Sequence, residues 1–236
     1  MPTYCTPADC LLCPARSGGL FGSLGAAALK RMPARGPVTF RLGRNHTVFQ
    51  ESGRAEHVYA IRQGRIKLVR RSLRGTERIV RILAPGDVAG LEALVADAYH
   101  LSAYTLGAAE VCQIPAPLVH QLQKENPEIA RALELRWQAN VDRADQVITL
   151  MSTGPAHERF FHFLLQMAEP ANSGVCPAIP RDDIAALLGL TMETVSRTIA
   201  AIKREGLVDE QNRRFLFNRG RVLEQVGASP ASPDPA

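Results

Sequence analysis

Sulfur ligands are the residues with the clearest chemistry in this chain. Residues 1–25 contain Cys5, Cys10 and Cys13, and Cys112 stands alone further along. Four thiolates can hold a [4Fe-4S] cluster, in which a Cys-x-x-Cys pair binds two irons of one cube. The same thiolates could instead bind zinc, and Cys10 with Cys13 could form a reversible disulfide. Cys112 alone could be a small buried apolar residue. The cysteines by themselves leave these chemistries open.

A second group of residues has the types and spacing of a DNA-reading motif. Asp182 to Leu188 predicts a short helix, Gly189 to Thr191 a tight turn, and Met192 to Glu205 a second helix. Two helices joined by a turn of three or four residues that contains glycine are typical of a helix-turn-helix. Thr191 is expected to cap the second helix.

The second predicted helix carries side chains that can read bases near its start and contact phosphates near its end. Arginine can fork onto guanine, glutamate can accept from cytosine, and serine or threonine can bind either base or phosphate. Lysine and arginine bind phosphates. The candidate DNA-binding residues are Glu193, Thr194, Ser196, Arg197, Lys203 and Arg204. The hairpin predicted at Leu207 to Phe217 looks like a wing beside this helix.

Other reactive residues form no pattern typical of an enzyme. The six histidines make no recognisable motif for a metal or haem. The sequence contains no nucleophile–base constellation and no phosphate-binding loop, so we predict that the protein is not an enzyme. Cys176, directly before Pro177, is interpreted as a strand residue without chemistry.

The elements that must position these groups follow two periodicities. From about residue 38 to 115, short apolar–polar alternations are broken by turn residues such as Gly64 and Gly86. This pattern predicts a small antiparallel β-roll. From Asn126 the period becomes helical, and one narrow apolar stripe continues to residue 152. The stripe consists of Ile129, Leu133, Trp137, Val141, Ala144, Ile148 and Met151.

The narrow stripe resembles one strand of a coiled coil, which needs a partner to bury it. We therefore predict a homodimer, and the alternative is that the stripe packs on the roll of the same chain. The opposite face of the helix is predicted to be polar and carries Glu128, Arg131, Glu134, Arg143 and Asp145. The predicted organisation is a cysteine-bearing segment (1–25), a sensor roll (26–125), a dimerisation helix (126–152), a winged helix-turn-helix (153–226) and a disordered tail (227–236).

Composition bounds the function. A content of 46% hydrophobic residues is enough for real cores and excludes wholesale disorder. The most apolar stretches are far shorter than the roughly 20 residues needed to cross a bilayer, and no secretory signal is visible. We expect a cytoplasmic protein with no membrane partner. The net charge of +5 favours an anionic partner only weakly.

The order of roll, long helix and winged helix-turn-helix resembles the CRP/FNR family of bacterial transcription regulators. The most specific portion is Leu188 to Arg197, in which Glu193, Ser196 and Arg197 match the Glu-x-x-Ser-Arg pattern of the FNR branch. The resemblance implies that these three residues read an inverted repeat similar to TTGAT and ATCAA. It also implies a contact with RNA polymerase through exposed loops of the roll.

The resemblance extends to the cysteines. Cys112 stands in a Val-Cys-Gln-Ile-Pro context similar to that of a cluster ligand in FNR, and Cys10-Leu-Leu-Cys13-Pro resembles a segment of alphaproteobacterial relatives. It implies an oxygen-labile [4Fe-4S] cluster held by Cys5, Cys10, Cys13 and Cys112, in a sensor that controls genes for low-oxygen metabolism. Many relatives carry the third N-terminal ligand near the place of Phe21, so Cys5 departs from the family spacing. The alternative is another trigger, such as nitric oxide, haem, thiol redox or zinc, or none.

Cyclic nucleotides, which other family members bind, fit this sequence poorly. The stretch Gly86 to Leu94 retains Gly90 and Glu92, but no arginine precedes Ser102-Ala103, where cyclic-AMP binders place one. A buried phosphate would be poorly neutralised without that charge.

Overall fold

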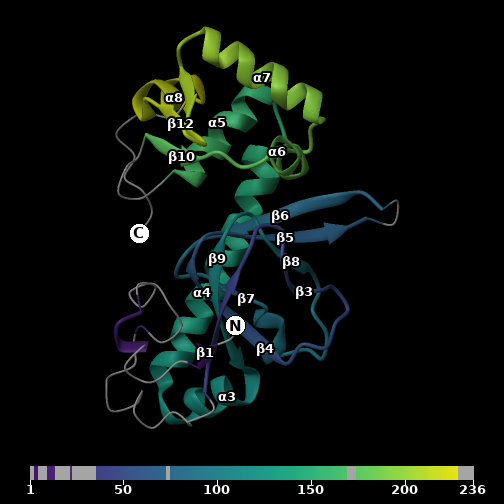
Figure 1. Ribbon diagram of the computed structural model, residues 1–236, viewed down its shortest axis with the longest axis vertical. Coiled ribbons are helices and arrows are strands. Elements are labelled where there is room, and N and C mark those ends of the chain that lie inside the picture. The colour runs from purple at the N-terminus through teal and green to yellow at the C-terminus, as the bar shows by residue number, and fades with distance from the viewer. Residues whose placement is uncertain are drawn as a thin grey trace. The chain divides into compact units, whose positions relative to one another are not determined.

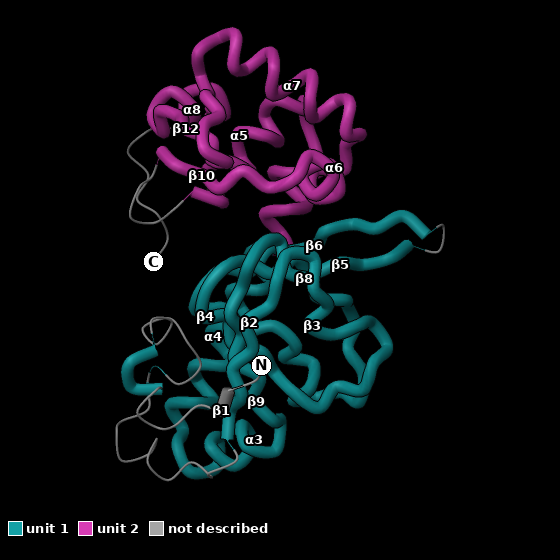
Figure 2. Tube along the Cα trace, viewed as in Figure 1, with its two compact units in different colours: residues 1–143 teal, residues 144–236 magenta. Residues whose placement is uncertain are grey.

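The computed structural model describes residues 3–4, 10–13, 22, 36–72, 75–168 and 174–227. The chain forms two compact units, residues 1–143 and residues 144–236 (Figure 2). Cys5 and the predicted tail beyond Gly227 lie outside the described residues. Both units combine helices with antiparallel strands, which confirms the predicted α+β class.

The first unit is built around two antiparallel sheets (Figure 1). In order across the first sheet, the strands are β1 (Thr3–Tyr4), β2 (Val38–Leu42), β9 (Ala109–Pro115), β4 (His57–Gln63) and β7 (Val88–Ala89). The second sheet contains β3 (Thr47–Phe49), β8 (Ser102–Thr105), β5 (Ile66–Arg71) and β6 (Glu77–Leu83). The predicted roll is therefore present.

Alternating side chains explain the strands of the roll. In β5, for example, Ile66 and Leu68 are buried while Lys67 between them is half-buried. Gly64 makes the turn into β5 with a positive φ of 78°, and a Cβ at this position would clash with the carbonyl oxygen of Ala108. Glycine is the residue that tolerates both conditions. A short helical turn, η1 (Leu91–Leu94), follows β7.

Two helices, α3 (Ala116–Glu125) and α4 (Pro127–Gln146), add apolar side chains to the core of the roll. From α3 come Leu118, Val119 and Leu122, and from α4 come Ile129 and Leu133. Helix α3 was not predicted from the sequence as a separate helix. Its ten residues are too few for the helical period to stand out beside the alternating pattern that precedes them.

The predicted continuous helix from residue 126 to 152 changes its winding before it ends. After α4, residues Val147–Met151 form a π-helical segment, η2. The hydroxyl groups of Thr149 and Thr153 each donate to the carbonyl oxygen four residues earlier. Val147 and Met151 are buried, and η2 packs against α5 (Ala156–Met167).

The second unit consists of helices around a three-stranded sheet (Figure 1). Its strands are β10 (Val175–Pro177), β12 (Arg214–Phe217) and β11 (Val208–Gln211), in this order across the sheet. Its remaining helices are α6 (Arg181–Leu188), α7 (Met192–Arg204) and α8 (Arg219–Gln225). Phe160, Phe163 and Phe215 are fully buried, and the ring of Phe160 meets that of Phe215 edge to face. This aromatic core holds α5 against the sheet.

Among the described residues, no single helix has the length and hydrophobicity to span a membrane. The pair Arg181–Leu188 and Met192–Arg204 passes by length and composition when taken together, but is bent by 102° between its helices.

Candidate nucleic-acid interface and thiol site

The angle between α6 and α7 has the geometry of a helix-turn-helix. Gly189 ends α6 in the left-handed conformation, with φ of 65°, and the two helices meet at a bend of 102°. Such motifs have interhelical angles of roughly 90–120°. Both helices bury their apolar faces. These faces comprise Ile184, Leu187 and Leu188 on α6, and Val195, Ile199 and Ile202 on α7.

Thr191 caps α7, as predicted. Its hydroxyl oxygen accepts from the backbone N–H of Thr194 at 3.1 Å, which satisfies one of the free donors at the helix start. The hydroxyl groups of Thr191 and Thr194 also lie 2.8 Å apart. Thr194, predicted to read DNA, is therefore half-buried and engaged in the cap.

The other candidate base readers lie on the exposed side of α7. The side chains of Glu193 and Arg197 are 76% and 72% exposed, and their charged groups are 3.5 Å apart. An ion pair this exposed contributes little to stability, so both groups can exchange their contact for a base edge. Ser196 is exposed, and its hydroxyl donates to the carbonyl oxygen of Met192 at 2.9 Å. Three polar side chains near one helix start form a surface suited to the major groove.

The candidate phosphate contacts at the end of α7 differ in their surroundings. Nζ of Lys203 lies 3.9 Å from the carboxylate of Glu210, which is also bound by Arg181 at 2.7 Å. Arg204 is exposed, and its Nε donates to the carbonyl oxygen of Ala200. Glu210 thus holds Lys203 toward the hairpin, whereas Arg204 faces solvent.

The hairpin of β11 and β12 has the form of a wing. Asn212 and Arg213 connect the strands, and both have positive φ angles, 49° and 59°. A two-residue turn of this kind matches the twist of paired strands. Arg213 and Arg214 are exposed at its tip, in the hairpin that follows α7 in sequence. Two guanidinium groups there add positive charge to the wing.

The described cysteines of the first unit have different surroundings. Cys10 and Cys112 are buried and belong to the same apolar core, while Cys13 is half-buried. Within the described residues, no three cysteine, histidine or acidic side chains gather closely enough to hold a metal ion. The structure therefore places Cys10 and Cys112 in one core without bringing Cys13 into a three-ligand group, and Cys5 falls outside the described part.

The sheet brings the start of the chain near the strand that carries Cys112. In β9, Cys112 is opposite Thr39 of β2 on one side and Ala60 of β4 on the other. Paired residues of antiparallel strands point to the same face. Strand β1 extends this sheet, and Thr3 is opposite Thr39. Thr3 and Tyr4, which directly precede Cys5, thus lie in the second strand away from the one that carries Cys112.

Charged side chains share this face of the sheet with Cys112. The carboxylate of Glu110, two residues before Cys112, lies 3.1 Å from Arg62 and 3.0 Å from Arg41. Arg62 also donates to the hydroxyl of Thr39 at 3.0 Å. Only 17% of the Arg62 side chain is exposed, so this is a half-buried polar network rather than a solvated surface.

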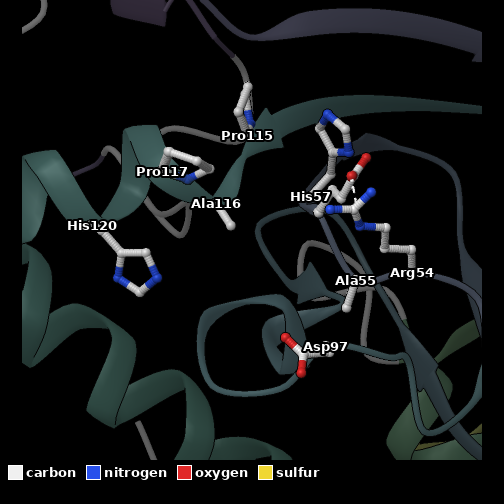
Figure 3. A pocket seen from close by; sticks show the side chains of 9 residues that line it. Arg54, Ala55, His57, Asp97, Pro115, Ala116, Pro117 and His120 are labelled. Carbon is white, nitrogen blue, oxygen red and sulfur yellow. Dashed lines mark ion pairs between the residues drawn. The ribbon is translucent and has the colours of Figure 1, made fainter.

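A pocket of about 670 Å³ lies where β9 meets α3. His120 faces His57 and Arg54 across this space (Figure 3). Arg54 is already paired with Glu56 at 3.0 Å, and Asp97 adds a second carboxylate. Burial lowers the pKa of His57, although Glu56 opposes this effect. The pocket thus has mixed charge and is a poor place for a nucleotide phosphate.

Contacts between α4 and the loop before β7 were not predicted from the sequence. Arg143 was predicted on the polar face of the helix, with no partner named. Its Nη2 lies 2.8 Å from Oδ1 of Asp87, a buried carboxylate. Arg136 of α4 donates to the carbonyl oxygen of Gly86 at 3.0 Å. The sequence does contain two arginines about two helical turns apart. Their spacing predicts no contact until the fold shows that Gly86 and Asp87 lie beside the helix.

The predicted dimerisation stripe is divided by the structure. Ile129 and Leu133 are buried in the core of the roll, and Met151 is buried in the second unit. The alternative that the stripe packs on the roll of the same chain thus holds for Ile129 and Leu133. Ala144 is half-buried. The remaining members stay exposed: Trp137 by 37%, Val141 by 51% and Ile148 by 62%.

Comparisons with known proteins agree with this arrangement. The family described as Cyclic nucleotide-binding domain matches residues 39–126, and the Crp-like helix-turn-helix domain matches residues 158–226. The nitrogen fixation regulation protein FixK of Bradyrhizobium diazoefficiens is 31% identical over 206 residues, covering 84% of this chain and 85% of that protein. The regulatory protein HlyX of Actinobacillus pleuropneumoniae is 29% identical, covering 75% of this chain and 76% of that protein.

A solved structure gives the same result. The structure of FixK2 from Bradyrhizobium japonicum has a TM-score of 0.72 at 25% identity and covers 84% of this chain and 99% of that one. The two matched domains, the helix-turn-helix geometry and the identity to FixK lead to one conclusion. The chain belongs to the CRP/FNR family of transcription regulators, in its FNR-like branch, whose members bind DNA, act as dimers and are not enzymes.

Proposed function

We propose that the protein is a dimeric regulator that reads a TTGAT-like inverted repeat and senses oxygen through a [4Fe-4S] cluster. In this role it controls genes for low-oxygen metabolism, through contact with RNA polymerase at its promoters. The observation that carries the DNA-reading part is the exposed Glu193, Ser196 and Arg197 on a capped, packed helix.

The inverted repeat follows from pairing of two copies. Each copy presents one α7, and two such helices enter successive major grooves about one helical turn apart. The exposed apolar residues Trp137, Val141 and Ile148 supply surface for the second copy. Arg197 is suited to guanine and Glu193 to cytosine, and Arg204 to the phosphate backbone.

The cluster ligands proposed are Cys5, Cys10, Cys13 and Cys112. Two observations support a meeting of these thiols: Cys10 shares a buried core with Cys112, and β1 extends the sheet that carries Cys112. Four soft thiolates are suitable ligands for the irons of a [4Fe-4S] cluster. When bound, the cluster would connect the four cysteines and would be labile to oxygen. Because no three such ligands converge in the described residues, the proposal requires the N-terminal thiols and Cys112 to come closer together when the group is bound.

Oxygen response then follows as a population shift. Cys10 of the N-terminal segment lies in the core to which α4 also contributes residues, so we expect ligation to favour the arrangement that dimerises. When the thiols lose their common partner, the segment is released, the dimer weakens and operator binding falls. The change in operator binding depends on how much more tightly the dimer binds the cluster than the monomer does.

Anaerobic purification tests this proposal. We expect brown protein with about four irons per chain, and exposure to air should bleach it and weaken binding to a TTGAT-type operator. Cys5→Ser and Cys112→Ser should each lower the iron content. Cys176→Ser is the matched control, since this thiol is fully buried in the second unit.

Colourless protein that binds the operator equally well in air would end the oxygen-sensing part and leave the DNA-reading part. A haem absorption band, or zinc in place of iron, would identify another trigger. Loss of operator binding in Cys176→Ser but not in Cys112→Ser would also contradict the proposed ligand set.

A further inference from the structure

The loop between β6 and β7 is bound to α4 at two points. Arg143 pairs with the carboxylate of Asp87 at 2.8 Å, and Arg136 donates to the carbonyl oxygen of Gly86 at 3.0 Å. The arginines are about two turns apart, or roughly 10 Å along the helix. Two polar contacts at this separation define both the rotation of α4 and its axial position on the roll. We call these four residues the α4–loop contact.

Asp87 is a rigid anchor for this contact. Its second carboxylate oxygen accepts from the backbone N–H of Ala84 at 2.8 Å, and its own N–H donates to the carbonyl oxygen of Ala84. Its carbonyl oxygen accepts from the N–H of Ile61 in β4. Only 10% of the Asp87 side chain is exposed. The position of Arg143 is thus fixed by the backbone of the roll, through a charge-assisted bond with limited access to water.

The surrounding charges make Asp87 more important than either arginine. Burial lowers the pKa of Arg81, with Glu92 opposing the effect and Arg143 adding to it. Burial also lowers the pKa of Arg136, with Asp87 opposing and Arg143 adding to the effect. Arg143 therefore repels Arg81 of the roll as well as Arg136 of its own helix. Without the carboxylate of Asp87, the repulsion between Arg143 and Arg81 would oppose the contact of α4 with the roll.

The same helix presents Trp137 and Val141 to solvent, one turn apart. Arg136 is the direct neighbour of Trp137, so a rotation that breaks the contact with Gly86 also turns Trp137 away. From this placement we propose that the α4–loop contact positions α4 for pairing with a second copy of this chain, with Arg136 and Arg143 as positioning residues. The proposal rests on the α4 dimer surface named in the proposed function, and adds the roll loop as the element that controls it.

The test compares charge-neutral variants by their dimer dissociation constants. Asp87→Asn, Arg143→Gln and the double variant would be measured by sedimentation equilibrium, anaerobically and in air, beside Arg131→Gln as an exposed control on α4. We expect Asp87→Asn to weaken the dimer by about tenfold or more, within the usual range of coupling between sites. Arg143→Gln should weaken it less. Arg143→Gln added to Asp87→Asn should restore part of the loss, because it removes one of the repelling charges.

Three outcomes would overturn the proposal. The first is folded Asp87→Asn and Arg143→Gln proteins, judged by circular dichroism, that dimerise as the wild type does. The second is a double variant no better than Asp87→Asn alone, which contradicts the role of charge repulsion. The third is an unaltered dimer in Val141→Glu, which would show that α4 is not the dimer surface at all. If Asp87→Asn does not fold, the dimer dissociation constants of Arg143→Gln and Arg136→Gln test the proposal instead. Both substitutions leave the exposed apolar residues of α4, Trp137 and Val141, unchanged.

Discussion

Helices α7 and α4 arise from the same 3.6-residue apolar period but have different surroundings. In α7 the whole stripe, Val195, Ile199 and Ile202, is buried within its own unit, and the exposed face is polar. In α4 the stripe begins in the core at Ile129 and ends exposed at Val141. A helix whose apolar stripe is buried in its own unit presents only polar groups to a partner. A helix whose stripe is partly exposed presents apolar surface. The first suits DNA and the second suits another copy of the protein.

The largest expected effect sharpens this contrast within α4. Leu133→Ala removes a side chain that is 1% exposed, and should lower the free energy of unfolding of the roll by about 2–5 kcal/mol. Val141→Ala should leave monomer stability within about 0.5 kcal/mol and weaken the dimer instead. Urea unfolding and sedimentation separate the two effects. Equal losses of stability in both variants would break the distinction between buried and exposed parts of the stripe.

On α7, Arg197→Ala should weaken operator binding while the fold stays intact. Loss of a bidentate base contact costs about 1–3 kcal/mol, and a dimer loses two such contacts. Fluorescence anisotropy with specific and scrambled DNA would measure the change and the relaxed specificity. Arg44→Ala, an exposed arginine on the roll, is the control with equal charge. A uniform loss for both DNA sequences would instead indicate that Arg197 contacts phosphate.

A smaller effect is expected at the start of α7. Thr191→Ala removes the oxygen that accepts from Thr194, and should cost about 0.5–2 kcal/mol of stability in the second unit. Thr191→Ser keeps the oxygen and should behave as the wild type does. Thermal unfolding of both variants checks this. If serine were as harmful as alanine, the methyl group rather than the cap would be responsible.

The smallest predicted effect concerns pH. Burial lowers the pKa of His162, with Glu158 opposing it, below the ordinary value of 6.5. As pH falls through that value, the unfolded chain takes up a proton before the folded one, so stability decreases. His162→Asn should flatten the dependence of the urea midpoint on pH between about pH 7.5 and about pH 5.5. A steeper dependence in the variant would contradict the direction of the shift.

Local signals were enough to predict the DNA-reading surface. Gly189 predicts the turn, Thr191 predicts the cap, and the apolar period predicts which face of α7 is buried. Each of these signals depends only on residues close in sequence. Distant contacts therefore have little effect on the turn, the cap or the buried face of α7. The contact between the hydroxyl groups of Thr191 and Thr194 was not predicted from the sequence, and whether Thr194 also binds DNA stays a prediction.

Distant contacts decided the rest of α4. The sequence placed Arg143 on the polar face, since charged residues are usually solvated, but Asp87 and the loop before β7 come from a different part of the chain. Likewise the burial of Ile129 and Leu133 depends on the roll lying beside them. The helical period predicts that one stripe of the helix is apolar, but it does not predict which part of the structure buries that stripe.

By itself, the sequence determined the order of roll, long helix and winged helix-turn-helix, and the side chains of α7 that we propose for contact with DNA. These properties depend on spacing along the chain, through turns, caps and alternation. The tertiary structure alone decided which part of α4 is buried, and that Asp87 receives Arg143. Both outcomes require the backbone of the roll to bring distant residues within contact distance, which no local pattern encodes.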